Sequence, residues 1–210
     1  MSSRNIAVVL ALTTMAAACH GRPASSRQRT ASSARGISVQ PGDVVFRRTD
    51  GLLGTLVTET DRASEYSHVG IIVSADTDTA IVHADPSSEL PGGGHVVRAS
   101  LNSFVNDSNV AGFAVFRLRN RSAFAVARAI EWAVDQARRQ VPFDGGLNLA
   151  DTSKLYCTEL VWRAYQRGGV TLVEPSRNRL QLPFGPDTVL LVSALAASPL
   201  LERIARRPSP

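Results

Sequence analysis

Residues 66–85 read Tyr-Ser-His-Val-Gly-Ile-Ile-Val-Ser-Ala-Asp-Thr-Asp-Thr-Ala-Ile-Val-His-Ala-Asp, which is two apolar runs separated by a polar loop. The runs at 66–73 and 80–84 are rich in valine and isoleucine, which are frequent in strands, and residues 74–79 are typical of a turn. The stretch therefore predicts an antiparallel β-hairpin.

One histidine lies on each predicted strand, His68 on the first and His83 on the second. Side chains alternate between the two faces of a strand, so the register decides which residues meet. If the hairpin is centred on residues 75 and 76, His68 pairs directly with His83. If it is centred on 76 and 77, His68 faces Asp85 and His83 is its diagonal neighbour. Both registers bring the two histidines together on one face, whereas a slip by one residue would separate them.

The pattern outside the hairpin is strand-rich before residue 119 and helical after it. Further strands are expected at 44–47, 96–98 and 112–118, with one helical face at 51–60. Three- and four-residue apolar spacing predicts a helix at 122–140 with Ser122 as N-cap, and a second helix is expected at 156–166, before Gly168-Gly169. An apolar segment follows at 188–196. This order predicts an α+β domain, with an antiparallel sheet and helices on one side of it.

The N-terminus has the form of an export signal. Arg4 precedes the apolar run 6–12, and three alanines lead to Cys19. The run is too short to span a bilayer, which takes about 20 apolar residues. Alanines directly before a cysteine resemble the lipobox of bacterial lipoproteins, so we expect residues 1–18 to be removed and Cys19 to be lipidated. Plain secretion is the alternative, because Ala16-x-Ala18 also fits an ordinary cleavage site.

Residues 19–36 are expected to form a flexible tether, because residues 22–36 contain no hydrophobic side chain larger than alanine. Residues 37–210 are then a single domain. Removing residues 1–18 deletes Arg4 alone, which leaves 22 basic against 18 acidic side chains and a net charge of +4. This mild excess suits anionic envelope surfaces, and the absence of a basic stripe with interleaved aromatics argues against nucleic-acid binding.

Cys157 is the candidate nucleophile, at the start of the predicted helix 156–166. The positive end of a helix dipole favours the thiolate over the thiol. The alternative is a buried structural cysteine, since Cys157 shares an apolar helix face with Leu160, Val161 and Ala164. His20 lies in the tether and His95 follows a glycine loop, so we expect both to be solvated.

His68 is then the expected base, with His83 fixing its ring tautomer, Asp85 as an alternative orienting residue, and backbone N–H groups at the helix start holding the oxyanion. A metal site is the competing interpretation of two close histidines. A Cys/His/His set is a poor match to zinc spacings, so we expect neither a metal nor another cofactor.

Four stretches of the chain resemble one family. They are Pro-Gly-Asp-Val-Val-Phe at 41–46, Tyr-Ser-His-Val-Gly-Ile at 66–71, Ile-Val-His-Ala-Asp-Pro at 81–86 and Leu-Tyr-Cys-Thr-Glu-Leu-Val-Trp at 155–162. Their order and spacing are similar to those of the permuted papain-like amidases of the YaeF/YiiX type, relatives of the NlpC-type cell-wall peptidases. Pro186-Asp187 also fits this pattern.

The resemblance implies a circularly permuted papain-like fold, with Cys157 as nucleophile, His68 as base and His83 at the third polar position. This family usually has glutamate at the position of His83.

The leading hypothesis is a thiol amidase or endopeptidase on the periplasmic side of a bacterial membrane, anchored through Cys19 and acting on envelope amide bonds, including those of peptidoglycan peptides. The alternatives are a hydrolase or acyltransferase acting on lipid amides or esters, and a non-catalytic binding lipoprotein.

Overall fold

A computed structural model describes residues 37–50, 59, 61–75, 78–87, 93–174 and 189–207. The predicted export signal, the tether with Cys19 and His20, nearly all of the predicted helical face at 51–60, and Pro186-Asp187 lie outside these residues. Among the described residues, no helix combines the length and the apolar character needed to cross a membrane.

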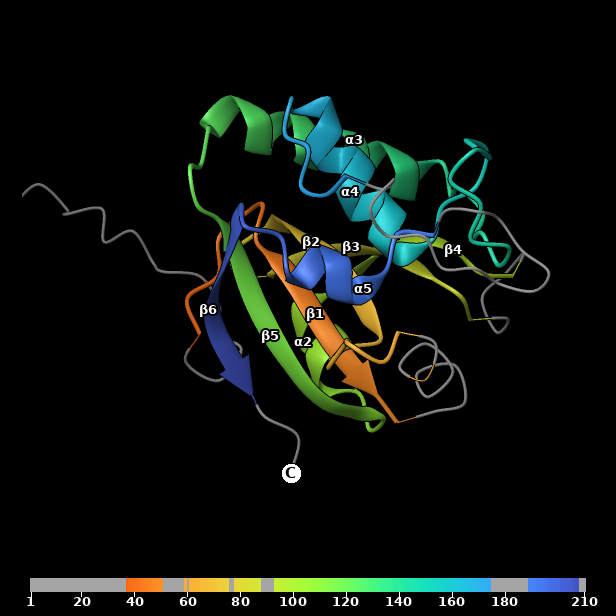
Figure 1. The fold of residues 1–210 in the computed structure, drawn as a ribbon, viewed down its shortest axis with the longest axis horizontal. Coiled ribbons are helices and arrows are strands. Elements are labelled where there is room, and N and C mark those ends of the chain that lie inside the picture. The colour runs from red at the N-terminus through yellow and green to blue at the C-terminus, as the bar shows by residue number, and fades with distance from the viewer. Residues whose placement is uncertain are drawn as a thin grey trace, which may run out of the picture.

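Six strands form one antiparallel sheet, and helices lie on both of its faces (Figure 1). The spatial order of the strands is β4-β3-β2-β1-β5-β6. The elements are β1 (Val44–Thr49), β2 (His68–Ser74), β3 (Ala80–Asp85), β4 (His95–Ser100), α2 (Leu101–Asn106), β5 (Val110–Leu118), α3 (Ala123–Arg138), α4 (Cys157–Arg167), α5 (Val192–Ala196) and β6 (Leu201–Arg207).

Strand alternation divides the core into two layers. Val44 and Phe46 of β1 pack with α3 and α4 on one face of the sheet. Val45 packs on the other face against Leu101 and Phe104 of α2. The expectation of helices on one side therefore holds for the two long helices, and the short α2, which the sequence analysis did not predict, covers the opposite face.

The predicted hairpin is confirmed, and its register is the one centred on residues 76 and 77. Ile71 pairs with Val82 and Ile72 with Ile81. Continued toward the start of β2, this register sets His68 opposite Asp85, with His83 diagonal to it. The register shifts between Ile72 and Ser74, as at a β-bulge.

The two long helices begin and end where the sequence indicated. The Ser122 side chain caps α3 by accepting from Ala125 N–H. Helix α4 ends at Arg167 with Gly168 as its C-cap, and Gly169 follows at φ +79°, a left-handed value that glycine adopts without strain. A Cβ on Gly168 would collide with the Ala125 carbonyl, so this glycine is what allows α3 and α4 to approach.

Candidate active site

The structure brings His68 and His83 into direct contact. Nε2 of His68 lies 3.0 Å from Nδ1 of His83, and both residues are buried. The two rings meet edge to face, with centroids 5.1 Å apart. Asp85 makes its side-chain hydrogen bond to the N–H of Ser87, at 2.9 Å, rather than to His68. Of the two candidates for orienting His68, the geometry therefore favours His83.

Cys157 is the first residue of α4, and its half-buried thiol lies against the start of β2. Burial raises the pKa of this thiol to about 11, against the opposing effect of the N–H groups of Val69, Thr158 and Cys157 itself. Val69 follows His68 directly, so the sulfur lies beside the backbone of the strand that carries His68. The helix start does favour the thiolate, as expected, but burial outweighs it and the resting sulfur is a protonated thiol.

Both imidazoles are neutral in this environment. Burial, together with the neighbouring His83 ring and the charge of Arg47, holds the pKa of His68 well below its ordinary value. Burial and Arg47 lower the pKa of His83 to about 3. The resting site therefore holds a neutral thiol and two neutral rings, in which one ring nitrogen of each histidine donates and the other accepts.

Two further residues, which were not predicted from the sequence, lie next to the histidine pair. Arg47 is the cross-strand partner of His68, and its guanidinium lies 4.4 Å from the centre of the Phe104 ring. The Phe104 ring in turn packs on both histidine rings, with centroids 5.7 and 5.0 Å away. A sequence signal for Arg47 existed, since it is a charged residue that shares a strand face with the buried Val45.

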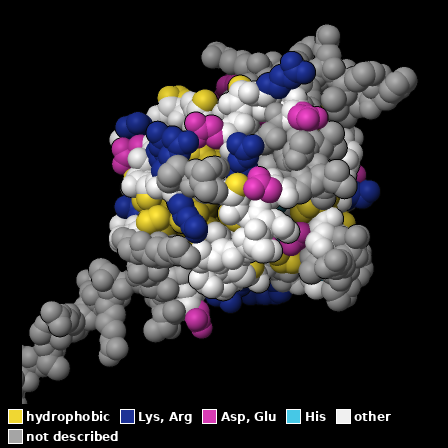
Figure 2. All heavy atoms as spheres, turned by 90° about the horizontal axis from the view of Figure 1, so that it is seen from below, with side chains coloured by type: hydrophobic (Ala, Val, Ile, Leu, Met, Phe, Trp, Pro, Cys, Tyr) yellow, Lys and Arg dark blue, Asp and Glu magenta, His cyan; other side chains and the backbone are white. Residues whose placement is uncertain are grey.

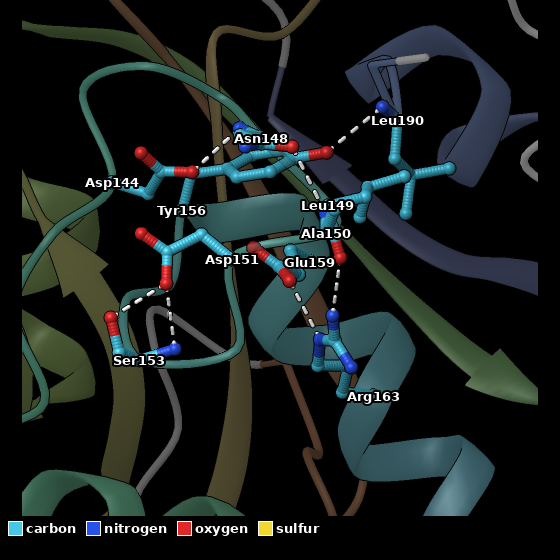
Figure 3. Close-up of polar contacts among 10 residues, drawn as sticks. All are labelled: Asp144, Asn148, Leu149, Ala150, Asp151, Ser153, Tyr156, Glu159, Arg163 and Leu190. Atoms are coloured by element: carbon cyan, nitrogen blue, oxygen red, sulfur yellow. Dashed lines mark hydrogen bonds and ion pairs between the residues drawn. The ribbon is translucent and has the colours of Figure 1, made fainter. Parts of the chain in front are cut away.

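The residues that flank Cys157 hold the start of α4 to a distant segment. The hydroxyl of Tyr156 accepts from Leu190 N–H at 2.9 Å, and the hydroxyl of Thr158 donates to Leu190 O at 2.7 Å. Figure 3 shows the Tyr156 bond. The N–H of Ser193 then donates to Asp61, in the loop before β2. Through these hydrogen bonds, the segment after residue 188 connects the start of α4 with the loop that leads into β2, the strand of His68.

The expectation that His95 is solvated is wrong. His95 begins β4 and is buried, with Nδ1 2.9 Å from Gly93 O. The carbonyl of Gly93, two residues earlier, contacts the ring. On the face drawn in Figure 2, basic and acidic side chains are interspersed, and no histidine is visible.

The fold and this site define the class of protein as papain-like, with the histidine strand before the cysteine helix along the chain. Residues 38–181 match the family described as "Permuted papain-like amidase enzyme, YaeF/YiiX, C92 family". The chain belongs to this family, and membership supports a hydrolase function.

The chain is similar to a solved structure described as metalloprotein yiiX from Escherichia coli O157:H7. The two share 20% sequence identity and a TM-score of 0.62, over 80% of this chain and 98% of the other. A search of curated proteins gave no match.

The described residues do not fit a metal centre. They contain no group of three or more histidine, cysteine, aspartate or glutamate side chains that could hold an ion. Nε2 of His68 and Nδ1 of His83 are hydrogen-bonded to each other, so these two nitrogens are not free to bind a metal ion together.

Proposed function

We propose that this chain is an exported, lipid-anchored thiol amidase or endopeptidase that cleaves amide bonds of the bacterial envelope, with peptidoglycan peptides as the leading substrates. The observation that carries the proposal is the His68–His83 contact at 3.0 Å beside a helix that begins at Cys157. Family membership supports the hydrolytic chemistry, and the N-terminal sequence supports the location.

The hydrogen bond between the histidines assigns the ring nitrogens. His83 engages Nε2 of His68, so the nitrogen left to take the thiol proton is Nδ1. Nδ1 must then be unprotonated, and Nε2–H donates to Nδ1 of His83. His83 thereby fixes the tautomer that makes His68 a base.

The reaction follows from this assignment. His68 Nδ1 takes the thiol proton as the sulfur attacks the amide carbon, and backbone N–H groups at the start of α4 stabilise the oxyanion. Collapse breaks the C–N bond, and the leaving amine takes the proton from His68. Water, deprotonated by His68, then hydrolyses the thioester and restores the thiol.

The test is cleavage of muropeptides by the purified full chain in water enriched in ¹⁸O. We expect one labelled oxygen in each new carboxyl group and one new amine, both lost in Cys157→Ala and His68→Ala and kept in the control His95→Asn. Cleavage that survives in Cys157→Ala would overturn the thiol mechanism. An acyl-enzyme formed with a long-chain lipid ester, with no muropeptide cleavage, would instead assign the lipid-directed reaction.

The anchor has its own test. Cells fed an alkyne-tagged fatty acid should incorporate the tag into the wild-type chain and not into Cys19→Ala. A tag-free mature chain in the wild type would show plain secretion and refute lipidation.

A further inference from the structure

Arg47 places a positive charge on the same face as the histidine pair. It lies opposite His68 in the register of β1 and β2, and directly opposed residues have Cβ atoms about 5 Å apart. Its field lowers the pKa of both His68 and His83, and it also acts on Cys157. The guanidinium is therefore electrostatically coupled to all three proposed catalytic residues.

The guanidinium is held in place by one aromatic residue. Its Nη1 donates to Phe104 O at 2.9 Å, while its carbon stacks over the Phe104 ring at 4.4 Å. Because the same ring packs on His68 and His83, Phe104 fixes the cation relative to the base and its orienting residue. A side chain held this firmly loses little further conformational entropy when it binds a ligand.

This charge has no ion-pair partner in the part of the chain that the structure describes. Asp85 and Asp107 act on Arg47 through space, but neither forms an ion pair with it. Its Nε is buried without a hydrogen-bond partner. A partly buried cation without a counter-ion is costly to the fold, and a bound anion would offset this cost.

We propose that Arg47 binds a carboxylate of the substrate next to the scissile bond, so that the enzyme selects acidic peptides. Arginine suits this role because its planar fork matches the two oxygens of a carboxylate. The neutral His83 fits as well, since a glutamate at this position would place its own carboxylate close to Arg47. The inference rests on the proposed function and narrows its substrate class.

The test compares iodoacetate with iodoacetamide, which differ in the negative charge next to the reacting carbon. In both reactions the Cys157 thiolate displaces iodide and forms a thioether. The thiol pKa cancels from the ratio of the two rates, because both reagents react with the same thiolate. The ratio therefore reports anion attraction separately from thiol activation. Modification at Cys157 is measured on the full chain by peptide mass spectrometry.

We expect Arg47→Met to lower the iodoacetate-to-iodoacetamide rate ratio about tenfold, equivalent to about 1.4 kcal/mol. Arg47→Lys should keep most of the ratio, because it keeps the charge. The matched control is Arg48→Met, one residue along β1 and exposed, which should leave the ratio unchanged. An unchanged ratio in Arg47→Met would overturn the proposal, even if both absolute rates fell together.

The two proposals fail separately. A falling ratio with no cleavage of muropeptides would keep the anion site and reject the substrate assignment. Cys157-dependent cleavage with an unchanged ratio would keep the hydrolase and reject Arg47 as its anion-binding residue. If Arg47→Met does not fold, as circular dichroism would show, the decision rests on whether Arg47→Lys retains the ratio and the muropeptide preference.

Discussion

Glu159, two residues after Cys157, is a buried acid whose charge should make stability depend on pH. It is fully buried in the first turn of α4. Its Oε1 accepts from Arg163 Nε at 2.6 Å, and Arg163 also donates to Leu149 O (Figure 3). Within the described residues, Oε2 has no hydrogen-bond partner. Burial raises the pKa of Glu159 to about 7, with the Arg163 bond opposing the rise.

The sign of the effect follows from the raised pKa. The folded-state pKa of about 7 lies above the ordinary value of 4.5, so the fold favours the protonated carboxyl. The wild type must then lose stability as the pH rises through this window. At about 1.36 kcal/mol per pKa unit, the full difference is about 3 kcal/mol. A titration that begins at pH 5 starts above the ordinary value of 4.5, so we expect about 2–3 kcal/mol of this difference between pH 5 and pH 8.

Glu159→Gln removes the titration and keeps an acceptor for Arg163. The assay is urea unfolding at pH 5, 6, 7 and 8 for the wild type, Glu159→Gln and the control Glu131→Gln. Glu131 forms an exposed pair with Arg128 at 2.6 Å. From pH 5 to pH 8, the variant should gain about 2–3 kcal/mol relative to the wild type, with no such trend in the control. A difference that is constant with pH would show that Arg163 keeps the carboxylate ionised throughout, and would refute the reasoning.

Three further predictions follow from the fold and the site. Asp43 is fully buried and accepts from Arg117 at 2.8 and 2.7 Å, so Asp43→Asn should cost about 2–4 kcal/mol in urea unfolding; a loss below about 0.5 kcal/mol would contradict this. Because the thiol pKa is about 11, iodoacetamide labelling of Cys157 should accelerate about tenfold per pH unit from pH 7 to 10, and a plateau at neutral pH would reveal a stable thiolate instead. His83→Glu should lower the iodoacetate-to-iodoacetamide rate ratio toward that of Arg47→Met, because the new carboxylate neutralises Arg47; an unchanged ratio would place the two side chains out of contact.

The sequence predicted the elements whose signals are local. The run at 44–47 predicted β1, and Ser122 marked the start of α3. The hairpin was predictable because its two apolar runs are adjacent along the chain. Its register was narrowed to two alternatives, and only the observed pairing of Ile71 with Val82 chose between them. Both alternatives gave the contact of His68 with His83, which is why that part of the site could be predicted.

The elements that were missed depend on distant partners. Strand β6 is an edge strand of mostly charged and partly exposed residues, and its conformation comes from pairing with β5. Helix α2 has six residues, too few for a periodic signal, and is stabilised by Phe104 packing on the sheet. The contacts of Leu190 with Tyr156 and Thr158 join residues more than 30 positions apart, which no local pattern encodes. Burial raises the thiol pKa of Cys157, and no local pattern encodes this effect, since burial is a property of the folded chain.

The electrostatics of the site explain why a substrate anion matters for the chemistry as well as for binding. Burial, with His83 and Arg47 adding to it, holds the pKa of His68 well below its ordinary value, while the thiol pKa is about 11, so proton transfer between them is uphill at rest. A carboxylate bound to Arg47 neutralises the charge that opposes protonation of His68 and raises the basicity of the ring. A bound substrate that covers the site also excludes water, and this strengthens the hydrogen bond from His68 to His83. An acidic peptide would thus activate the base that deprotonates the attacking thiol, and a neutral amide of the same shape would leave the site at rest.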